Sequence, residues 1–301
     1  MADSTLYIKR ERPLETFLLA VIYGAASISV FLLLGIMGYV FFKGFRVLSL
    51  RFFTTVSSAL KGTVGIAGNL VNTMYVIVIT LLIATPLGVG GAIYLNEYAK
   101  RGRVVRMVEF ATETLSGIPS VVFGLFGMVF FGNVLGLGYS LLNGSLTLTF
   151  MVLPLILRNT QEALRAVPDS YRSGALGMGA QKWYMIRTIL LPSAMPGILT
   201  GVILAVGRIV GESAALLFTA GSARLLPKLD GTFVENLGKL GHKGLEPGGT
   251  LTIELYLRMQ NGEYEAAFGI GCVLMGIVLF INLLLKSAYR LRLAAKGFEK
   301  A

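Results

Sequence analysis

Residues 165–198 read RAVPDSYRSGALGMGAQKWYMIRTILLPSAMPGI, a polar segment rich in small residues that lies between two strongly apolar ones. Pro168 and Asp169 can start a short helix, because proline fits the first helical turn and aspartate caps it. Gly179 permits the left-handed turn that would end this helix. We therefore expect a short helix lying across the face of a membrane. From composition alone, a simple amphipathic connector is an equal alternative.

Apolar runs extend outward from this segment in both directions. Hydrophobic residues make up 54% of the 301 residues and charged residues 14%, whereas soluble domains have about 25% charged residues. Several runs reach the roughly 20 residues that cross a bilayer core. The sequence predicts an all-α integral membrane protein of about six transmembrane helices. The expected spans are residues 16–42, 70–95, 107–135, 140–157, 198–220 and 266–285.

The basic residues suggest the orientation of these spans. They gather in the N-terminal tail, at 100–106, at 158–187 and after 285, and short cytoplasmic loops carry an excess of lysine and arginine. We expect a single membrane domain over 16–290, with the tails 1–15 and 291–301 both cytoplasmic. The coupling loop would cover 161–188 and a long external segment 221–265, in which the part 222–248 has no evident role.

Several function classes lack support in the sequence. The net charge of +11 is spread between apolar runs, and no base-reading motif accompanies it. No G-x-x-x-x-G-K-[S/T] loop is present, so ATP would have to be bound by another chain. Cys272 and His242 are each the single residue of their type, which argues against a disulfide, a metal site or a membrane enzyme built on convergent His and Asp side chains. We expect no catalytic residue in this chain.

The segment 165–198 resembles the cytoplasmic loop of ABC importer permeases, whose pattern is E-A-A, three residues, G, nine residues and I-x-L-P. The matching positions of this sequence are Ser173, Gly174, Ala175, Gly179, Ile189, Leu191 and Pro192. Serine stands where the family usually has glutamate, and glycine replaces the first alanine. The resemblance implies a coupling helix that docks on an ATPase subunit, but an ion pair made by that glutamate cannot be assumed.

Four further stretches resemble the permease of the Pst phosphate-uptake system, of its A type. They are ATPLGVGGAIYLNEYA at 84–99, ETLSGIPSVVFGLFG at 113–127, LPLILRNTQEALRAVPDSYR at 153–172 and GRIVGESAALLFTAG at 207–221. The resemblance implies a type I ABC importer permease fold in the prokaryotic cytoplasmic (inner) membrane, and import of inorganic phosphate. Importers of another oxyanion, such as molybdate or sulfate, and a passive anion channel remain alternatives.

The same resemblance implies the partners of the chain. A second, related permease would complete the pathway, two ATP-binding subunits would hold ATP and magnesium, and an extracytoplasmic phosphate-binding protein would deliver the ion. The chain itself would hold no cofactor and no metal, and its remaining surface would face membrane lipid.

Two charged residues lie within the expected span 198–220. Arg208 and Glu212 are four residues apart and would share one helical face. A charge at membrane depth costs at least about 2.5 kcal/mol, so such residues face protein or a watered cavity. Arginine suits a phosphate path because it can hold two oxyanion oxygens at once. A purely structural ion pair is the alternative.

The expected span 107–135 contains Gly117, Pro119, Gly124 and Gly127. These residues are typical of a membrane helix that is either broken or closely packed, and the sequence does not separate the two. Ser116 and Ser120 flank Pro119 and would be weak hydrogen-bond donors to the pathway.

Overall fold

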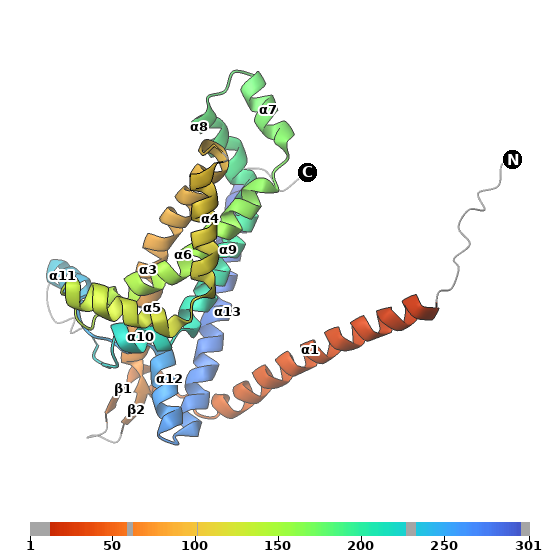
Figure 1. Cartoon of the computed structure of the whole chain (residues 1–301). Coiled ribbons are helices and arrows are strands. Elements are labelled where there is room, and N and C mark those ends of the chain that lie inside the picture. The colour runs from red at the N-terminus through yellow and green to blue at the C-terminus, as the bar shows by residue number, and fades with distance from the viewer. Residues whose placement is uncertain (1–12, 59–62, 101, 227–232, 296–301) are drawn as a thin grey trace.

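The structure is a computed structural model that describes residues 13–58, 63–100, 102–226 and 233–295, most of them helical (Figure 1). The elements of the first half are α1 (Pro13–Phe45), α2 (Leu50–Thr54), β1 (Val56–Ser58), β2 (Thr63–Ile66), α3 (Ala67–Ile93), a π-helical turn (Tyr94–Tyr98), α4 (Arg103–Gly117), α5 (Ser120–Gly127), a second π-helical turn (Met128–Val134) and α6 (Leu141–Arg165). Those of the second half are α7 (Asp169–Gly177), α8 (Lys182–Met185), a third π-helical turn (Ile186–Leu190), α9 (Leu191–Gly211), α10 (Ala214–Thr219), α11 (Phe233–Lys243), α12 (Leu251–Gln260) and α13 (Tyr264–Ala295).

Membrane-spanning helices dominate this architecture. Among the described residues, five helical segments are long and apolar enough to cross a bilayer, and a bent pair raises the number to six. The predicted all-α membrane fold is thereby confirmed. A short antiparallel hairpin of β1 and β2, which pairs Val56 with Ile66, is an addition that the sequence analysis did not foresee.

The expected single span over 107–135 is broken. α4 and α5 meet at an angle of 103°. Ile118 is extended, with ψ of 132°, because the residue before a proline avoids the helical conformation, and Pro119 itself offers no N–H to continue the helix. Close packing also occurs: a Cβ on Gly124 would lie 2.9 Å from the Cα of Ala215 in α10. The segment 107–135 therefore contains both a broken helix and a close contact between helices, the two alternatives that the sequence left open.

The expected span 198–220 was placed too late along the chain. The continuous apolar span runs from Lys182 to Gly211, and the residues from Ala214 to Thr219 form the separate helix α10. Pro192 lies in the first turn of α9, and Pro196 lies within the same helix. A membrane helix can continue through proline because neighbouring groups satisfy the backbone carbonyls that lose their hydrogen bonds.

The body of the molecule is built around α6, which packs against both α3 and α9. A Cβ on Gly88 of α3 would lie 2.8 Å from the Cγ2 of Ile156 in α6, and a Cβ on Gly201 of α9 would lie 2.7 Å from the Cβ of Asn159. Small residues let helix backbones approach closely where no water-driven force exists between membrane helices. These contacts set the spacing of the three central helices.

Gly88→Val is expected to destabilise the protein by roughly 1–3 kcal/mol, because the added carbons overpack the interface between α3 and α6. Thermal unfolding of the purified protein in detergent would measure this as a lower midpoint. Gly90→Val is the matched control, since it makes the same change in helix propensity in the same helix and a Cβ there meets no atom within 4 Å. Equal midpoints for the two variants would contradict the packing argument.

The elongated body has two distinct ends (Figure 1). α7 and α8 form one end, and the hairpin β1–β2 with α12 forms the other; we call these the α7 end and the hairpin end. α1 contacts α13 near the hairpin end, where the rings of Tyr39 and Phe268 lie 5.6 Å apart. From there α1 runs away from the body, and no residue of its most apolar continuous stretch of 18 residues is buried.

Candidate functional site

Arg208 lies in the last turn of α9 and its side chain is exposed. Leu204 and Thr200, one and two turns earlier, are exposed too, so the three define a stripe of α9 that the rest of the described chain leaves uncovered. Arg208 has no ion pair or hydrogen bond with any described residue. An uncovered arginine on an apolar span needs a watered path or a second protein chain beside it.

The helix that carries Arg208 stops one residue before Glu212, so the expected continuous helix through both residues is not observed. α9 ends at Gly211, and Glu212 is extended with ψ of 124°. Its carboxylate Oε1 accepts the backbone N–H of Ala215 at 3.1 Å, and its own carbonyl accepts the hydroxyl of Thr252 at 2.9 Å. Glu212 is therefore hydrogen-bonded both to the start of α10 and to a residue of α12. Its second carboxylate oxygen, Oε2, has no hydrogen bond with the described residues.

Ser116 and Ser120 lie on either side of the other break. The Ser116 hydroxyl donates to the carbonyl of Thr112 at 2.9 Å within α4, and Ser120 is the first residue of α5. α5 packs against α10. The structure thus brings the two helix breaks into one region, with a serine pair at one break and the Arg208–Glu212 corner at the other.

α7 is the short helix expected at the polar segment. Gly179 follows it with φ of +81°, and two hydrogen bonds close its end: Gly179 N–H donates to Leu176 O at 3.0 Å and Ala180 N–H to Ala175 O at 3.1 Å. This pair of bonds is the Schellman arrangement, in which the residue after the helix is left-handed and is usually glycine. Gly179 therefore fixes where α7 stops.

The outer side of α7 is uncovered and partly apolar. Met178 is 84% exposed and Leu176 50%, and Gly174 adds no side chain. The Ser173 hydroxyl donates to the carbonyls of Asp169 and Ser170 within the helix, at 3.1 and 3.3 Å. A serine satisfied in this way does not replace the ion pair of a glutamate. The end of α7 with Leu176 and Met178 is therefore a small, partly apolar protrusion, which we call the α7 knob.

The inner side of α7 and the segment after it are anchored to the body. Ala175 is 2% exposed and packs with a cluster that includes Leu164, Met185 and Ile186. Ile189 packs against the same cluster, and Leu191 and Pro192 begin α9. Of the motif residues, Ala175 and Ile189 are therefore packed against the body, whereas Ser173 and Gly174 face outward.

A buried charge cluster at the hairpin end was missed by the sequence analysis. Glu254, fully buried in α12, pairs with Arg224 and with Arg258, each at 2.7 Å. Arg258 also contacts Glu263 and donates to the Ser57 hydroxyl at 2.5 Å. Charge spacing within α12 could have suggested the i,i+4 pair of Glu254 and Arg258, but not Arg224, which lies 30 residues away.

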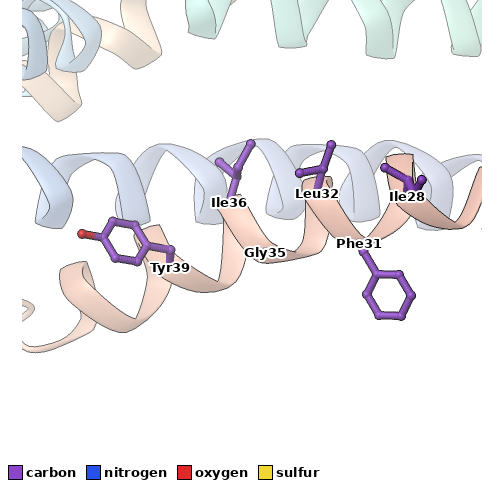
Figure 2. Close-up of a pocket in the computed structure, with 6 residues that line it drawn as sticks. All are labelled: Ile28, Phe31, Leu32, Gly35, Ile36 and Tyr39. Carbon is purple, nitrogen blue, oxygen red and sulfur yellow. The ribbon is translucent and has the colours of Figure 1, made fainter. Parts of the chain in front are cut away.

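Two hollows accompany these features. One, of about 230 Å³, lies between α4 and α6 and is lined only by polar side chains, those of Glu109, Thr112, Glu113, Arg158, Gln161, Glu162 and Arg165. Its arginines are held by carboxylates, Arg158 by Glu162 and Arg165 by Glu109. The other, of about 480 Å³, is a shallow apolar face of α1 (Figure 2). Figure 2 shows side chains of one helix only, with the Tyr39 hydroxyl as the one polar group, so this face offers no anion site.

Together, the apolar spans, the paired helix breaks and the knob at one end define a membrane-embedded permease subunit. The chain belongs to the binding-protein-dependent transport system inner membrane component family, whose model matches residues 84–291.

Curated relatives agree with this family. The chain is 39% identical over 263 residues to the probable ABC transporter permease protein YqgI of Bacillus subtilis, which covers 86% of this chain and 89% of that protein. It is 37% identical over 178 residues to the phosphate transport system permease protein PstA of Xylella fastidiosa, covering 59% of this chain and 62% of that one.

A solved bacterial alginate ABC transporter, in complex with a pentasaccharide-bound periplasmic protein, contains a chain with the same fold. The TM-score is 0.63 at 15% identity, and the match covers 95% of this chain and 97% of that chain. At this identity the likeness speaks for the fold alone.

Proposed function

We propose that this chain is the permease subunit of an ATP-driven importer of inorganic phosphate and forms half of the translocation pathway. The observation that carries the proposal is Arg208, an uncovered cation at a helix break in an apolar span. A guanidinium stays charged and holds an oxyanion through two oxygens. The PstA relatives support phosphate as the ion.

The free carboxylate oxygen of Glu212 favours phosphate over sulfate or molybdate. At neutral pH phosphate keeps at least one proton, which needs an acceptor, whereas the other two ions carry none. Glu212 follows Arg208 by four residues and retains one oxygen outside the bond to Ala215. A conducting site must bind weakly, and a carboxylate at the same helix end as the cation lowers the affinity for an anion.

In this proposal ATP and magnesium are bound by two partner ATPase subunits, and the chain takes no part in hydrolysis. The α7 knob, with Leu176 and Met178, docks on an ATPase subunit. In this proposal the α7 end and both termini lie at the cytoplasmic side of the inner membrane. The hairpin end then faces the phosphate-binding protein outside.

A second, related permease is the partner that completes the pathway. The uncovered stripe of Thr200, Leu204 and Arg208 forms one side of the pathway in this proposal, and a second protein chain must form the other side. α1 supplies further apolar surface, because it leaves the body and has no buried residue in its apolar stretch. Lipid covers what the partner does not.

The test is uptake of radiolabelled phosphate into proteoliposomes that hold the chain with its candidate permease, ATPase and binding-protein partners. We expect uptake that requires ATP and that excess unlabelled phosphate suppresses, while excess sulfate or molybdate does not. Suppression by sulfate or molybdate would reassign the substrate to another oxyanion. Uptake that persists without ATP would identify a passive channel instead.

A further inference from the structure

A single arginine joins three elements at the α7 end. Arg172 of α7 donates from Nη2 to the carbonyl of Leu164 in α6, at 2.8 Å, and from Nη1 to the carbonyl of Val167 in the following turn, at 2.9 Å. It also pairs with Glu97 in the π-helical turn that follows α3, with Nη2 to Oε1 at 2.9 Å and Nε to Oε1 at 3.3 Å. Asp169 accepts from Nη1 at 3.0 Å.

These bonds use every donor of the guanidinium. Arginine has five N–H groups in a fixed plane, and the contacts with Leu164, Val167, Asp169 and Glu97 account for all five. Lysine has three donors on a flexible stem and cannot reproduce this arrangement. The geometry is therefore specific to arginine.

Glu97 is held in place from its own side. Its side chain is 5% exposed, and Asn96 donates to its Oε1 at 2.7 Å. Glu97 lies in the π-helical turn that ends the α3 span, and such turns are frequent at functional positions. Because α7 is continuous in sequence with α6 and α8 but not with α3, this ion pair is a polar bond that ties α7 to α3 across 75 residues of chain.

α3 reaches from this ion pair to the hairpin end. At its start, the amides of Asn69 and Asn72 donate to the carbonyl of Gly249 at 3.0 and 3.1 Å, and the Thr73 hydroxyl accepts the N–H of Leu251 at 2.9 Å. The helix is therefore bonded to α7 at one end, through Glu97 in the turn that follows it, and to the segment before α12 at the other end. A displacement of α7 can act on both ends of the body through one helix.

We propose that Arg172 and Glu97 are positioning residues that pass the ATP-driven movement of α7 to α3, and through α3 to the segment before α12. This inference rests on the proposed function, since it assumes that α7 docks on an ATPase. The ion pair touches neither ATP nor the transported ion. Its loss should uncouple hydrolysis from transport rather than abolish either component.

The experiment uses the complete transporter in proteoliposomes and measures basal ATP hydrolysis, its stimulation by the phosphate-loaded binding protein, and phosphate imported per ATP. Arg172→Lys should keep basal hydrolysis and lower the phosphate imported per ATP by at least about tenfold, as expected when charge-assisted bonds are lost. Glu97→Gln should give the same loss. The double variant should lose little more, because residues of one network are not additive.

Arg165→Lys is the matched control. Arg165 also joins two helices at the α7 end, through Glu109 of α4 at 2.9 Å, but it makes no bond to α7. Its phosphate-to-ATP ratio should stay within about twofold of the unaltered complex, as befits an exposed ion pair.

An unaltered phosphate-to-ATP ratio in Arg172→Lys would overturn the inference. Should that variant fail to assemble, Glu97→Gln decides by the same ratio, since it preserves the shape of the side chain and removes only its charge. A lowered ratio in Arg165→Lys as well would also overturn it, because the effect would then be a general one of this end. Absence of phosphate import by the unaltered complex would instead refute the proposed function.

Discussion

Arg208→Gln is expected to lower phosphate uptake by at least about a hundredfold while the complex still assembles. The guanidinium can make two charge-assisted hydrogen bonds to the ion, each worth about 1.5–3 kcal/mol, and glutamine offers no charge. Assembly should survive because Arg208 is exposed and unbonded within the described chain. Uptake in proteoliposomes and co-purification of the subunits are the two measurements.

Two further variants sharpen this prediction. Arg208→Lys keeps the charge but loses the planar fork, and should therefore retain part of the uptake. Arg290→Gln removes an exposed arginine near the end of α13 and should leave uptake unchanged. Normal uptake by Arg208→Gln would show that the ion does not pass this side chain, and the pathway would have to be sought elsewhere.

Gly179→Val should abolish most ATP-driven uptake, by at least about tenfold. A left-handed backbone costs a residue with a Cβ about 1–2 kcal/mol, and more when the side chain is branched. With φ of +81° at this position, the chain would abandon the turn and its bonds to Leu176 and Ala175. α7 would then end elsewhere, and the knob at Met178 would be displaced from its docking position.

Uptake and retention of the ATPase subunits on the permease would check this prediction. Gly179→Ala compared with Gly177→Ala is the matched pair: both add one methyl group, neither meets an atom within 4 Å, and only the first lies at positive φ. Gly179→Ala should be impaired and Gly177→Ala should not. Equal behaviour of the two would mean that the left-handed turn has no part in docking.

Local patterns in the sequence were sufficient for much of this protein. Apolar runs of bilayer length predicted the helical membrane fold, because each span satisfies its own backbone hydrogen bonds and needs no knowledge of its neighbours. Pro168, Asp169 and Gly179 predicted where α7 begins and ends, although Pro168 stands at the N-cap and Asp169 does not cap the helix as expected. The family resemblance rested on such stretches and is confirmed.

Errors in the prediction arose where local signals had two readings. Prolines break one span at Ile118–Pro119 yet sit inside another at Pro192 and Pro196. Proline costs a hydrogen bond in both cases, and the neighbouring helices decide whether the helix continues. The expected helix through Arg208 and Glu212 fails for a related reason: the prediction continued the helix to residue 220, whereas α9 ends at Gly211.

The sequence by itself therefore determined the membrane class of the chain, the position of α7 and the presence of an arginine in an apolar span. Only the tertiary structure decided that α5 and α10 meet, that Glu212 holds Ala215, and that Arg172 binds Glu97 across 75 residues. The physical reason is the distance along the chain over which each kind of interaction acts. Hydropathy and helix caps act within a few turns of one chain segment, whereas the partner of a side chain depends on how distant helices pack.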